Sequence, residues 1–205
     1  MTRTLIASLA VLMAGVLAFA GLTRGFTVLT AESARRQAVA AAPIPIPELI
    51  GIDQRGTRRR VFESAEHRVV IVDFIYTRCT SLCSALGSSY QRLQSAIEAQ
   101  HLEHAVRLVT VSFDPAHDTQ EVIHEYGRSL GAKPNIWTIL QPLDPEALRR
   151  SLKVFGVVAT PAPQGQFAHN AAFHVIDRRG RLARIIDISK PDAALSAARR
   201  LYGGS

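Results

Sequence analysis

The two cysteines of the chain, Cys79 and Cys83, are the residues whose type and spacing most directly suggest chemistry. They lie four positions apart, a spacing that brings two sulfurs to the same side of a helical turn. A disulfide closing so short a loop adds little stability to a chain of 205 residues, so a structural bridge does not explain the pair. Thiolates are both nucleophiles for disulfide exchange and soft ligands for Cu(I). The pair therefore predicts either copper binding or a redox-active dithiol that can form a disulfide.

The histidine that we expect to complete a metal site is His169, one of seven in the chain. It ends the predicted loop 161–168 and directly precedes a predicted strand at 173–177, and in a thioredoxin-like fold that loop packs beside the reactive cysteines. Two thiolates and one imidazole make a three-coordinate Cu(I) site, with room for a further ligand on oxidation to Cu(II). His174 alternates with its neighbours along the strand, and we interpret it as structural.

Two aspartates are candidates for a supporting role. Asp114 follows a predicted strand in the sequence Ser-Phe-Asp-Pro, at the carboxyl end of a parallel strand, where sites of α/β proteins gather. It could orient a ligand, act as an acid or base, or simply form a turn. Asp73 lies within another predicted strand, where we expect it to be buried and to tune the thiols. Arg78 and the amides of the helix that follows favour the thiolate form of the cysteines.

The elements that position these residues alternate between strands and helices. The β-branched and aromatic run 69–76 predicts a strand buried on both faces. Hydrophobic spacing, capping residues and turn residues predict a hairpin at 48–62, strands at 106–113, 136–140, 173–177 and 183–187, and helices at 81–100, 118–130, 144–155 and 191–202. Cysteines placed between a strand and a helix N-terminus are typical of thioredoxin. We therefore predict an α/β, thioredoxin-like fold with a central mixed sheet flanked by helices.

The first 47 residues differ in composition from the rest. Residues 5–22 are nearly all apolar, a length that is marginal for a membrane span and long for a signal-peptide core. We expect residues 1–24 to be a membrane anchor or signal segment, residues 25–47 an extended linker rich in Ala and Pro, and residues 48–205 the thioredoxin-like domain. A retained anchor would hold the domain on the periplasmic side of the cytoplasmic membrane. Cleavage near residues 18–20 would instead release a secreted, soluble form.

The net charge of +7 is compatible with a partner that carries negative charge. The sequence has neither a nucleic-acid-binding motif nor a basic stripe interleaved with aromatics, so we do not expect nucleic acid to be the partner. The basic residues fit an Arg-rich solvated surface or a surface that meets an acidic protein.

From about residue 48 to residue 203 the chain resembles the Sco/SenC family of copper-binding, thioredoxin-like proteins. The resemblance rests on Asp73-Phe-Ile-Tyr-Thr-Arg-Cys79 with Cys83, on residues 111–115 followed by Asp118-Thr119, and on His169 ahead of 173–180. It implies that Cys79, Cys83 and His169 bind copper as Cu(I) or Cu(II).

The resemblance also implies a function. The family delivers copper to the dinuclear centre of cytochrome c oxidase, or reduces the cysteines of that centre. The chain is therefore expected to be a membrane-tethered metallochaperone whose partner is the copper-bearing oxidase subunit or another periplasmic copper or thiol protein. The alternative is a thiol–disulfide reductase or redox sensor that uses Cys79 and Cys83.

The chain departs from the family at five positions. Thr80 and Ser84 stand where the family usually has Pro, Ala168 and Asn170 flank the histidine, and His174 replaces a Tyr. None of these changes removes an expected ligand. Together they favour a divergent paralogue with an altered copper affinity or a redox role.

Overall fold

The computed structural model of the chain describes residues 2–22, 30–62, 67–79, 82–163 and 166–204, with the backbone alone described for 2–5, 22 and 82–85. The helices are α1 (Thr2–Leu22), α2 (Ala31–Ala41), α3 (Leu82–Ala99), α4 (Gln120–Ser129), α5 (Pro145–Phe155) and α6 (Pro191–Gly203). The main sheet contains β1 (Ile44–Pro45), β2 (Ile50–Asp53), β3 (Arg58–Arg60), β4 (Val69–Ile75), β5 (Val106–Ser112), β6 (Trp137–Pro142), β9 (Ala172–Ile176) and β10 (Arg181–Asp187). A separate two-stranded sheet contains β7 (Ala159–Ala162) and β8 (Gln166–His169).

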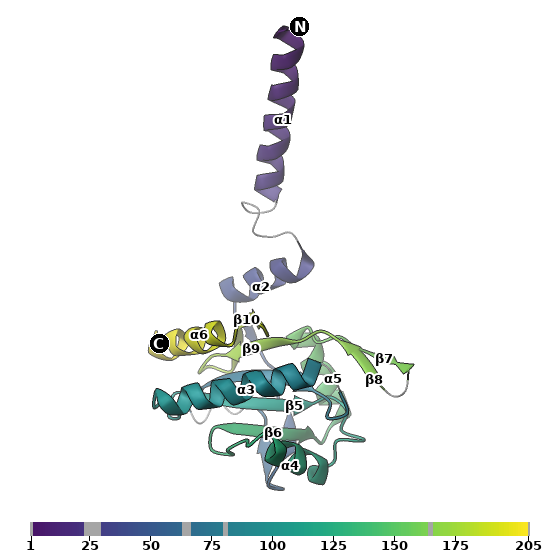
Figure 1. The fold of residues 1–205 in the computed structure, drawn as a ribbon, viewed down its shortest axis with the longest axis vertical. Coiled ribbons are helices and arrows are strands. Elements are labelled where there is room, and N and C mark those ends of the chain that lie inside the picture. The colour runs from purple at the N-terminus through teal and green to yellow at the C-terminus, as the bar shows by residue number, and fades with distance from the viewer. Residues whose placement is uncertain (1, 23–29, 63–66, 80–81, 164–165, 205) are drawn as a thin grey trace.

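The main sheet is mixed, as the sequence predicts. Its strand order is β1-β10-β9-β4-β5-β6-β2-β3, with β4, β5 and β6 parallel and the remaining pairs antiparallel (Figure 1). Helices α3 and α6 contact each other and β5, and α6 also contacts β4, while α4 lies against β6 and β2. The α/β architecture predicted from the alternation of strands and helices is therefore confirmed.

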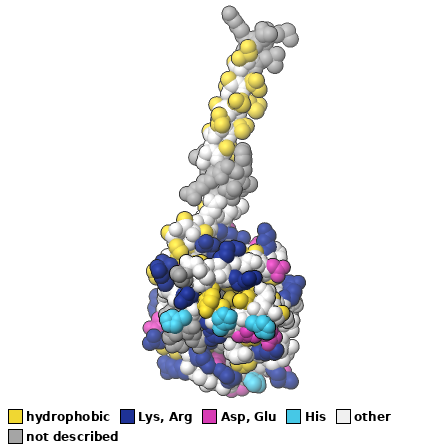
Figure 2. All heavy atoms as spheres, turned by 90° about the vertical axis from the view of Figure 1, so that its left-hand side faces the viewer, with side chains coloured by type: hydrophobic (Ala, Val, Ile, Leu, Met, Phe, Trp, Pro, Cys, Tyr) yellow, Lys and Arg dark blue, Asp and Glu magenta, His cyan; other side chains and the backbone are white. Residues whose placement is uncertain are grey.

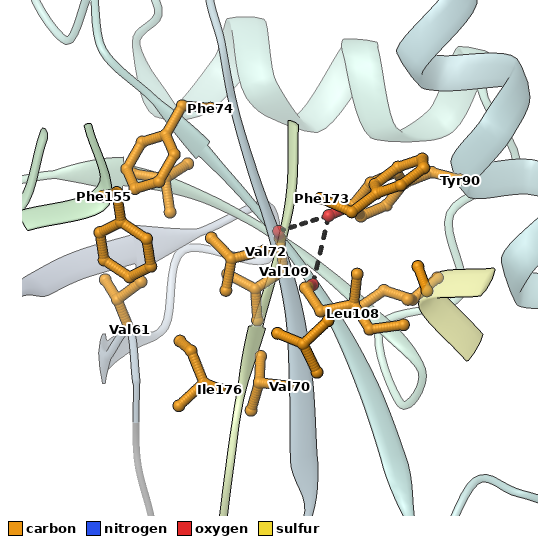
Figure 3. Close-up of a cluster of buried hydrophobic side chains, with 14 of the residues drawn as sticks. Val61, Val70, Val72, Phe74, Tyr90, Leu108, Val109, Phe155, Phe173 and Ile176 are labelled. Atoms are coloured by element: carbon orange, nitrogen blue, oxygen red, sulfur yellow. Dashed lines mark hydrogen bonds between the residues drawn. The ribbon is translucent and has the colours of Figure 1, made fainter. Parts of the chain in front are cut away.

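The two central strands are buried at every position, which explains their continuous apolar sequence. Figure 3 shows the core beside them, where Phe74 of β4 lies against Phe155 of α5, with 5.0 Å between ring centroids. The hydroxyl of Tyr90, from α3, donates to the backbone oxygens of Ile71 (3.2 Å) and Val109 (3.3 Å). These bonds tie α3 to the two strands that end at the candidate site.

Helix boundaries follow from capping chemistry that the sequence displays. The Thr119 hydroxyl accepts from the amide of Val122 at the start of α4. Asp144 accepts from the amides of Glu146 and Ala147 and is followed by Pro145 as the first residue of α5. Gly156 ends α5 in the left-handed conformation, at φ 66°, which costs glycine little.

Two parts of the chain differ from the sequence-based expectation. Residues 31–41, predicted to belong to an extended linker, instead form α2, which contacts β10 and buries Val39. Ala is the strongest helix former, and the Thr30–Ser33 capping box starts the helix before the prolines begin at residue 43. The segment 161–168, expected as a loop, instead contributes residues to the antiparallel pair of β7 and β8.

The expected N-terminal helix is present as α1, which stands away from the domain in Figure 1 and carries exposed apolar side chains in Figure 2. The large ones are Ile6, Leu9, Val11, Leu12, Met13, Val16, Leu17 and Phe19. Among the described residues, no helix combines the length and the hydropathy required to cross a membrane. The expectation of a transmembrane span at residues 1–24 is therefore not confirmed.

Candidate metal and thiol site

Cys79 lies where β4 leaves the sheet, and Cys83 lies in the first turn of α3. These are the backbone positions that the sequence predicts for the pair. Cys79 is half-buried against the hydrophobic core, and its amide donates to the carbonyl of Tyr76 at 3.3 Å. The side chain of Cys83 lies outside the described residues, so the predicted pairing of the two sulfurs stays a prediction.

A buried carboxylate fixes the segment that leads to Cys79. Asp118 is fully buried and accepts from both the amide (3.0 Å) and the hydroxyl (2.6 Å) of Thr77. It also accepts from the hydroxyl of Ser112, at the end of β5, at 2.6 Å. Asp118 thus joins the ends of two parallel strands beside the cysteine. Sequence analysis used Asp118 only as a capping residue and part of a motif, and missed this role.

Asp114, predicted to support the site, belongs to the same end of the sheet. Its Oδ2 accepts from Arg78 Nη2 at 2.8 Å, and its Oδ1 lies 2.9 Å from His117 Nδ1. Partial burial alone would raise the pKa of Asp114, but the hydrogen bonds from His117 and Arg78 outweigh it and hold that pKa below its usual value. Asp114 therefore stays ionised and holds the residue adjoining Cys79.

Asp73, the other predicted supporting residue, is buried in β4 as expected. Burial raises its pKa to about 7, against the opposing hydrogen bonds of Thr110 and Tyr90. Its Oδ1 has no hydrogen-bond partner among the described atoms. Asp73 is thus a protonatable group in the core beneath α3, and its predicted effect on the thiols stays a prediction.

His169 ends β8, at the base of the hairpin that projects from the body of the domain (Figure 1). Its half-buried ring meets Phe113 and Tyr76 edge to face, at centroid distances of 5.1 and 5.8 Å. Nδ1 lies 3.1 Å from the carbonyl of Asn170, whereas the buried Nε2 has no hydrogen-bond partner within the described part of the chain. A buried imidazole nitrogen without a partner suits a metal-ligand position, because coordination would satisfy it.

Tyr76 connects the hairpin to the cysteine segment. Its hydroxyl donates to Gln166 Oε1 at 2.8 Å and accepts from the amide of Phe167 at 3.2 Å. Tyr76 is therefore linked to both residues, to His169 through its ring and to Cys79 through its backbone carbonyl. Sequence analysis took Tyr76 only as the last residue of a strand, and nothing in the local pattern indicated that its partners lie 90 residues away.

Asn170, one of the departures from the family, has a structural role of its own. Its Oδ1 accepts from the amide of Val158 and its Nδ2 donates to the carbonyl of Gly156, each at 2.8 Å. It therefore pins the base of the hairpin to the end of α5.

His174 is buried, as the structural interpretation requires. Its Nε2 lies 3.0 Å from the carbonyl of Phe155, and burial followed by the charge of Arg35 lowers its pKa to about 4. It is therefore neutral at neutral pH and packs edge to face on Phe155, at 5.2 Å between ring centroids. A residue so enclosed belongs to the core rather than to the candidate site.

Within the described side chains, no three His, Cys, Asp or Glu residues gather closely enough to hold a metal ion. Because the side chain of Cys83 is not among them, the ligand set Cys79, Cys83 and His169 stays a prediction.

Comparison with known proteins settles the family. The SCO1/SenC family model matches residues 50–202, which is most of the chain. The chain belongs to the SCO1/SenC family. A SCO1 protein homolog of Bacillus subtilis is 23% identical over 124 residues, which make up 60% of this chain and 63% of that protein. The chain therefore matches just under two thirds of that relative's length.

Solved structures of Sco proteins share the fold. A SCO1/SenC family lipoprotein from Bacillus anthracis aligns with a TM-score of 0.70 at 20% identity, over 78% of this chain and 96% of that one. BsSco, described as having a disulfide switch and as a member of the Sco family of cytochrome c oxidase assembly proteins, aligns with a TM-score of 0.68 at 20% identity, over 80% and 96%. Copper-bound ScoI of Bradyrhizobium japonicum aligns with a TM-score of 0.57 at 20% identity, over 76% and 99%.

Proposed function

We propose that this chain binds copper through Cys79, Cys83 and His169 and passes it on during assembly of the copper centre of cytochrome c oxidase. The observation that carries the proposal is the position of His169, whose buried and unpartnered Nε2 shares Tyr76 as a neighbour with Cys79. Two thiolates and an imidazole are donors that suit Cu(I). Copper bound to a related Sco protein supports the same chemistry here.

In this proposal copper is cargo, and the residues around the site hold its ligands in place. Asp118 and Asp114 fix the segment 77–79, while Tyr76 holds the hairpin that carries His169. The recipient is the copper-bearing subunit of the oxidase or another periplasmic copper or thiol protein.

The test is a titration of the full chain with Cu(I) against a chromophoric chelator. We expect one copper per chain, and we expect His169→Ala to weaken the affinity by at least about tenfold. His104→Ala is the matched control, because His104 is exposed and lies in the loop before β5. Equal affinity in His169→Ala and the control would reject the proposed ligand set.

We further propose that α1 attaches the domain to the cytoplasmic membrane, with the domain on the periplasmic side. The support is the set of large apolar side chains that α1 exposes. Cells that express the chain with and without residues 1–24 can be fractionated, and removal of the segment is expected to move the domain from the membrane fraction to the soluble fraction. An unchanged distribution would reject the attachment.

A second candidate function is thiol–disulfide exchange, in which oxidation of Cys79 and Cys83 to a disulfide reduces a disulfide of the client to two thiols. The disulfide switch described for BsSco favours it. This function needs no histidine, so turnover on a disulfide substrate that persists in His169→Ala would support it over copper transfer. Loss of turnover in the same variant would count against it.

A further inference from the structure

A basic pocket lies at the opposite end of the sheet from Cys79. Strand β9 runs antiparallel to β4 and pairs Ile176 with Val70, so the residues after β9 lie at the start of β4. Because seven residues of β4 span about 20 Å, this pocket is remote from the cysteine. The pocket has a volume of about 220 Å³, and its lining consists of Asp177, Arg178, Arg179, Arg181, Arg200, Leu201 and Gly204.

Asp177 is the only acidic residue among the described residues of that lining, and its carboxylate already has hydrogen-bond and ion-pair partners. Asp177 Oδ1 accepts from the amides of Arg179 and Arg181, at 2.9 and 3.0 Å, as part of the β9–β10 turn. Its Oδ2 accepts from Nε and Nη2 of Arg181, at 2.9 and 2.7 Å. Asp177 and Arg181 therefore neutralise each other, and no carboxylate of the described residues compensates the charges of the other three arginines in the lining.

Arg178 is held in a fixed position inside the pocket. Its guanidinium carbon lies 5.3 Å from the centroid of the Tyr202 ring, and Nη1 donates to the Tyr202 carbonyl at 3.4 Å. Its Nε is buried and has no hydrogen-bond partner in the described structure. Leaving a buried donor unpaired is costly, so this nitrogen suits an acceptor that the described residues do not supply.

Arg179 and Arg200 complete the lining from the β9–β10 turn and the last turn of α6. No ion pair of either side chain with a carboxylate occurs among the described residues. Figure 2 views the molecule from the side on which Figure 1 places the C-terminus, and basic side chains on that face are more abundant than acidic ones. The electrostatic field at the pocket therefore favours an anion.

We propose that this pocket binds a phosphate group. Arginine forks match the oxygens of phosphate, and Arg178 is already held against Tyr202, so binding would cost it little further side-chain entropy. A volume of about 220 Å³ is below the usual range for organic ligands, so it suits a phosphate with a small substituent rather than a nucleotide. Inorganic phosphate and the headgroup of an anionic phospholipid share this chemistry.

The experiment is arginine-directed labelling of the full chain in lipid nanodiscs, read residue by residue by mass spectrometry. One arm adds inorganic phosphate to discs of phosphatidylcholine, against chloride at equal ionic strength. The other arm adds phosphatidylglycerol to the discs without phosphate. If the Kd for phosphate is about 1 mM, about 10 mM phosphate would fill about nine-tenths of the pockets. The rate at which Arg178 and Arg200 are labelled should then fall about tenfold.

The arm that gives protection identifies the source of the phosphate group. Arg178→Gln should abolish the protection of Arg200, and Arg200→Gln, an exposed change, should weaken the protection of Arg178. Arg149→Gln removes an equal charge from the exposed face of α5 and should leave both unchanged. The proposal would be overturned if neither arm protected Arg178 and Arg200 from labelling. It would also be overturned if Arg200 were still protected in folded Arg178→Gln.

Discussion

The two sides of Cys79 are held by different kinds of structure. On the sheet side, the fully buried Asp118 binds Thr77 and Ser112 through three hydrogen bonds, so the segment before the cysteine is part of the core. On the hairpin side, β7 and β8 pair only with each other, and the Tyr76 hydroxyl and the Asn170 side chain tie the hairpin to the rest of the domain. The thiol of Cys79 therefore lies beside the main sheet, whereas the imidazole of His169 lies on a hairpin outside that sheet, which we expect to open more easily.

In the copper site proposed above, this asymmetry offers a way to release the metal. His169, on the hairpin, could leave the copper while the other proposed ligands stay in place, as transfer to a recipient would require. The predictions below weaken the sheet side and the hairpin side in turn.

The largest effect is expected from Asp118→Ala. The substitution removes three hydrogen bonds and leaves the Thr77 amide and the Ser112 hydroxyl buried without an acceptor. We expect the free energy of unfolding to fall by about 3 kcal/mol. Urea unfolding of the full chain in detergent measures the change, and Asp118→Asn, which keeps one acceptor, should lose less. A loss below about 1 kcal/mol in Asp118→Ala would mean that the sheet side is not held as described.

The buried Asp73, in β4 on the sheet side of the site, is expected to make the free energy of unfolding depend on pH. Burial raises its pKa in the folded chain to about 7, whereas an exposed Asp titrates near 4. The folded state therefore holds a proton that the unfolded state has lost, and stability falls as the pH rises from about 4 to about 7.

Between pH 5 and pH 7 this group is expected to remove about 2 kcal/mol from the free energy of unfolding. Asp73→Asn cannot ionise, so the stability of the variant relative to that of the native chain should rise by about that amount over the interval. Denaturant unfolding at several pH values measures it. If the free energies of unfolding of the two proteins change in parallel with pH, Asp73 does not titrate between pH 5 and pH 7.

A smaller effect is expected on the hairpin side from Tyr76→Phe. The variant loses the bonds to Gln166 and to the amide of Phe167, at a cost of about 1 kcal/mol. Hydrogen exchange at residues 166–169 should become faster while exchange in β4 and β5 stays slow. Tyr90→Phe is the control, since it removes a hydroxyl from the core and leaves the hairpin bonds intact. Equal acceleration in both variants would remove the proposed distinction between the two sides.

The smallest effect is expected from Arg78→Gln, which breaks the ion pair with Asp114. Because the Arg78 side chain is 39% exposed, solvent screens the pair, and the loss should be about 0.5 kcal/mol or less. Thermal unfolding of the variant beside the native chain measures this loss. A loss as large as that of Asp118→Ala would mean that Asp114 and Asp118 contribute equally to stability, contrary to this account.

The sequence predicts correctly those strands, helices and turns that are marked by a local signal. The apolar run of β4, the Thr119 and Asp144 caps and the turn at Gly180 are local signals, and the elements that they predict are present. The hairpin of β7 and β8 was missed because its strands have four residues each, include Pro161 and pair with no strand of the main sheet. Helix α2 was not predicted because the prolines that follow it at residues 43–47 favour extended backbone, whereas its own Ala-rich sequence and the Thr30 cap favour a helix.

The same reasoning applies to the candidate site. The backbone positions of Cys79 and Cys83 could be predicted from their places beside a strand and a helix, whereas His169, expected at the end of a loop, is the last residue of β8. The groups that hold them could not, because Asp118 lies 41 residues from Thr77 and Gln166 lies 90 residues from Tyr76. Contacts over such separations depend on the tertiary fold and leave no periodic pattern in the sequence.

The most direct test of the central claim is X-ray absorption spectroscopy of the full chain loaded with one Cu(I). The account predicts two sulfur neighbours and one imidazole nitrogen around the copper, with the multiple-scattering signal of histidine lost in His169→Ala and kept in His104→Ala. A spectrum of sulfur neighbours alone, unchanged by the loss of His169, would contradict it.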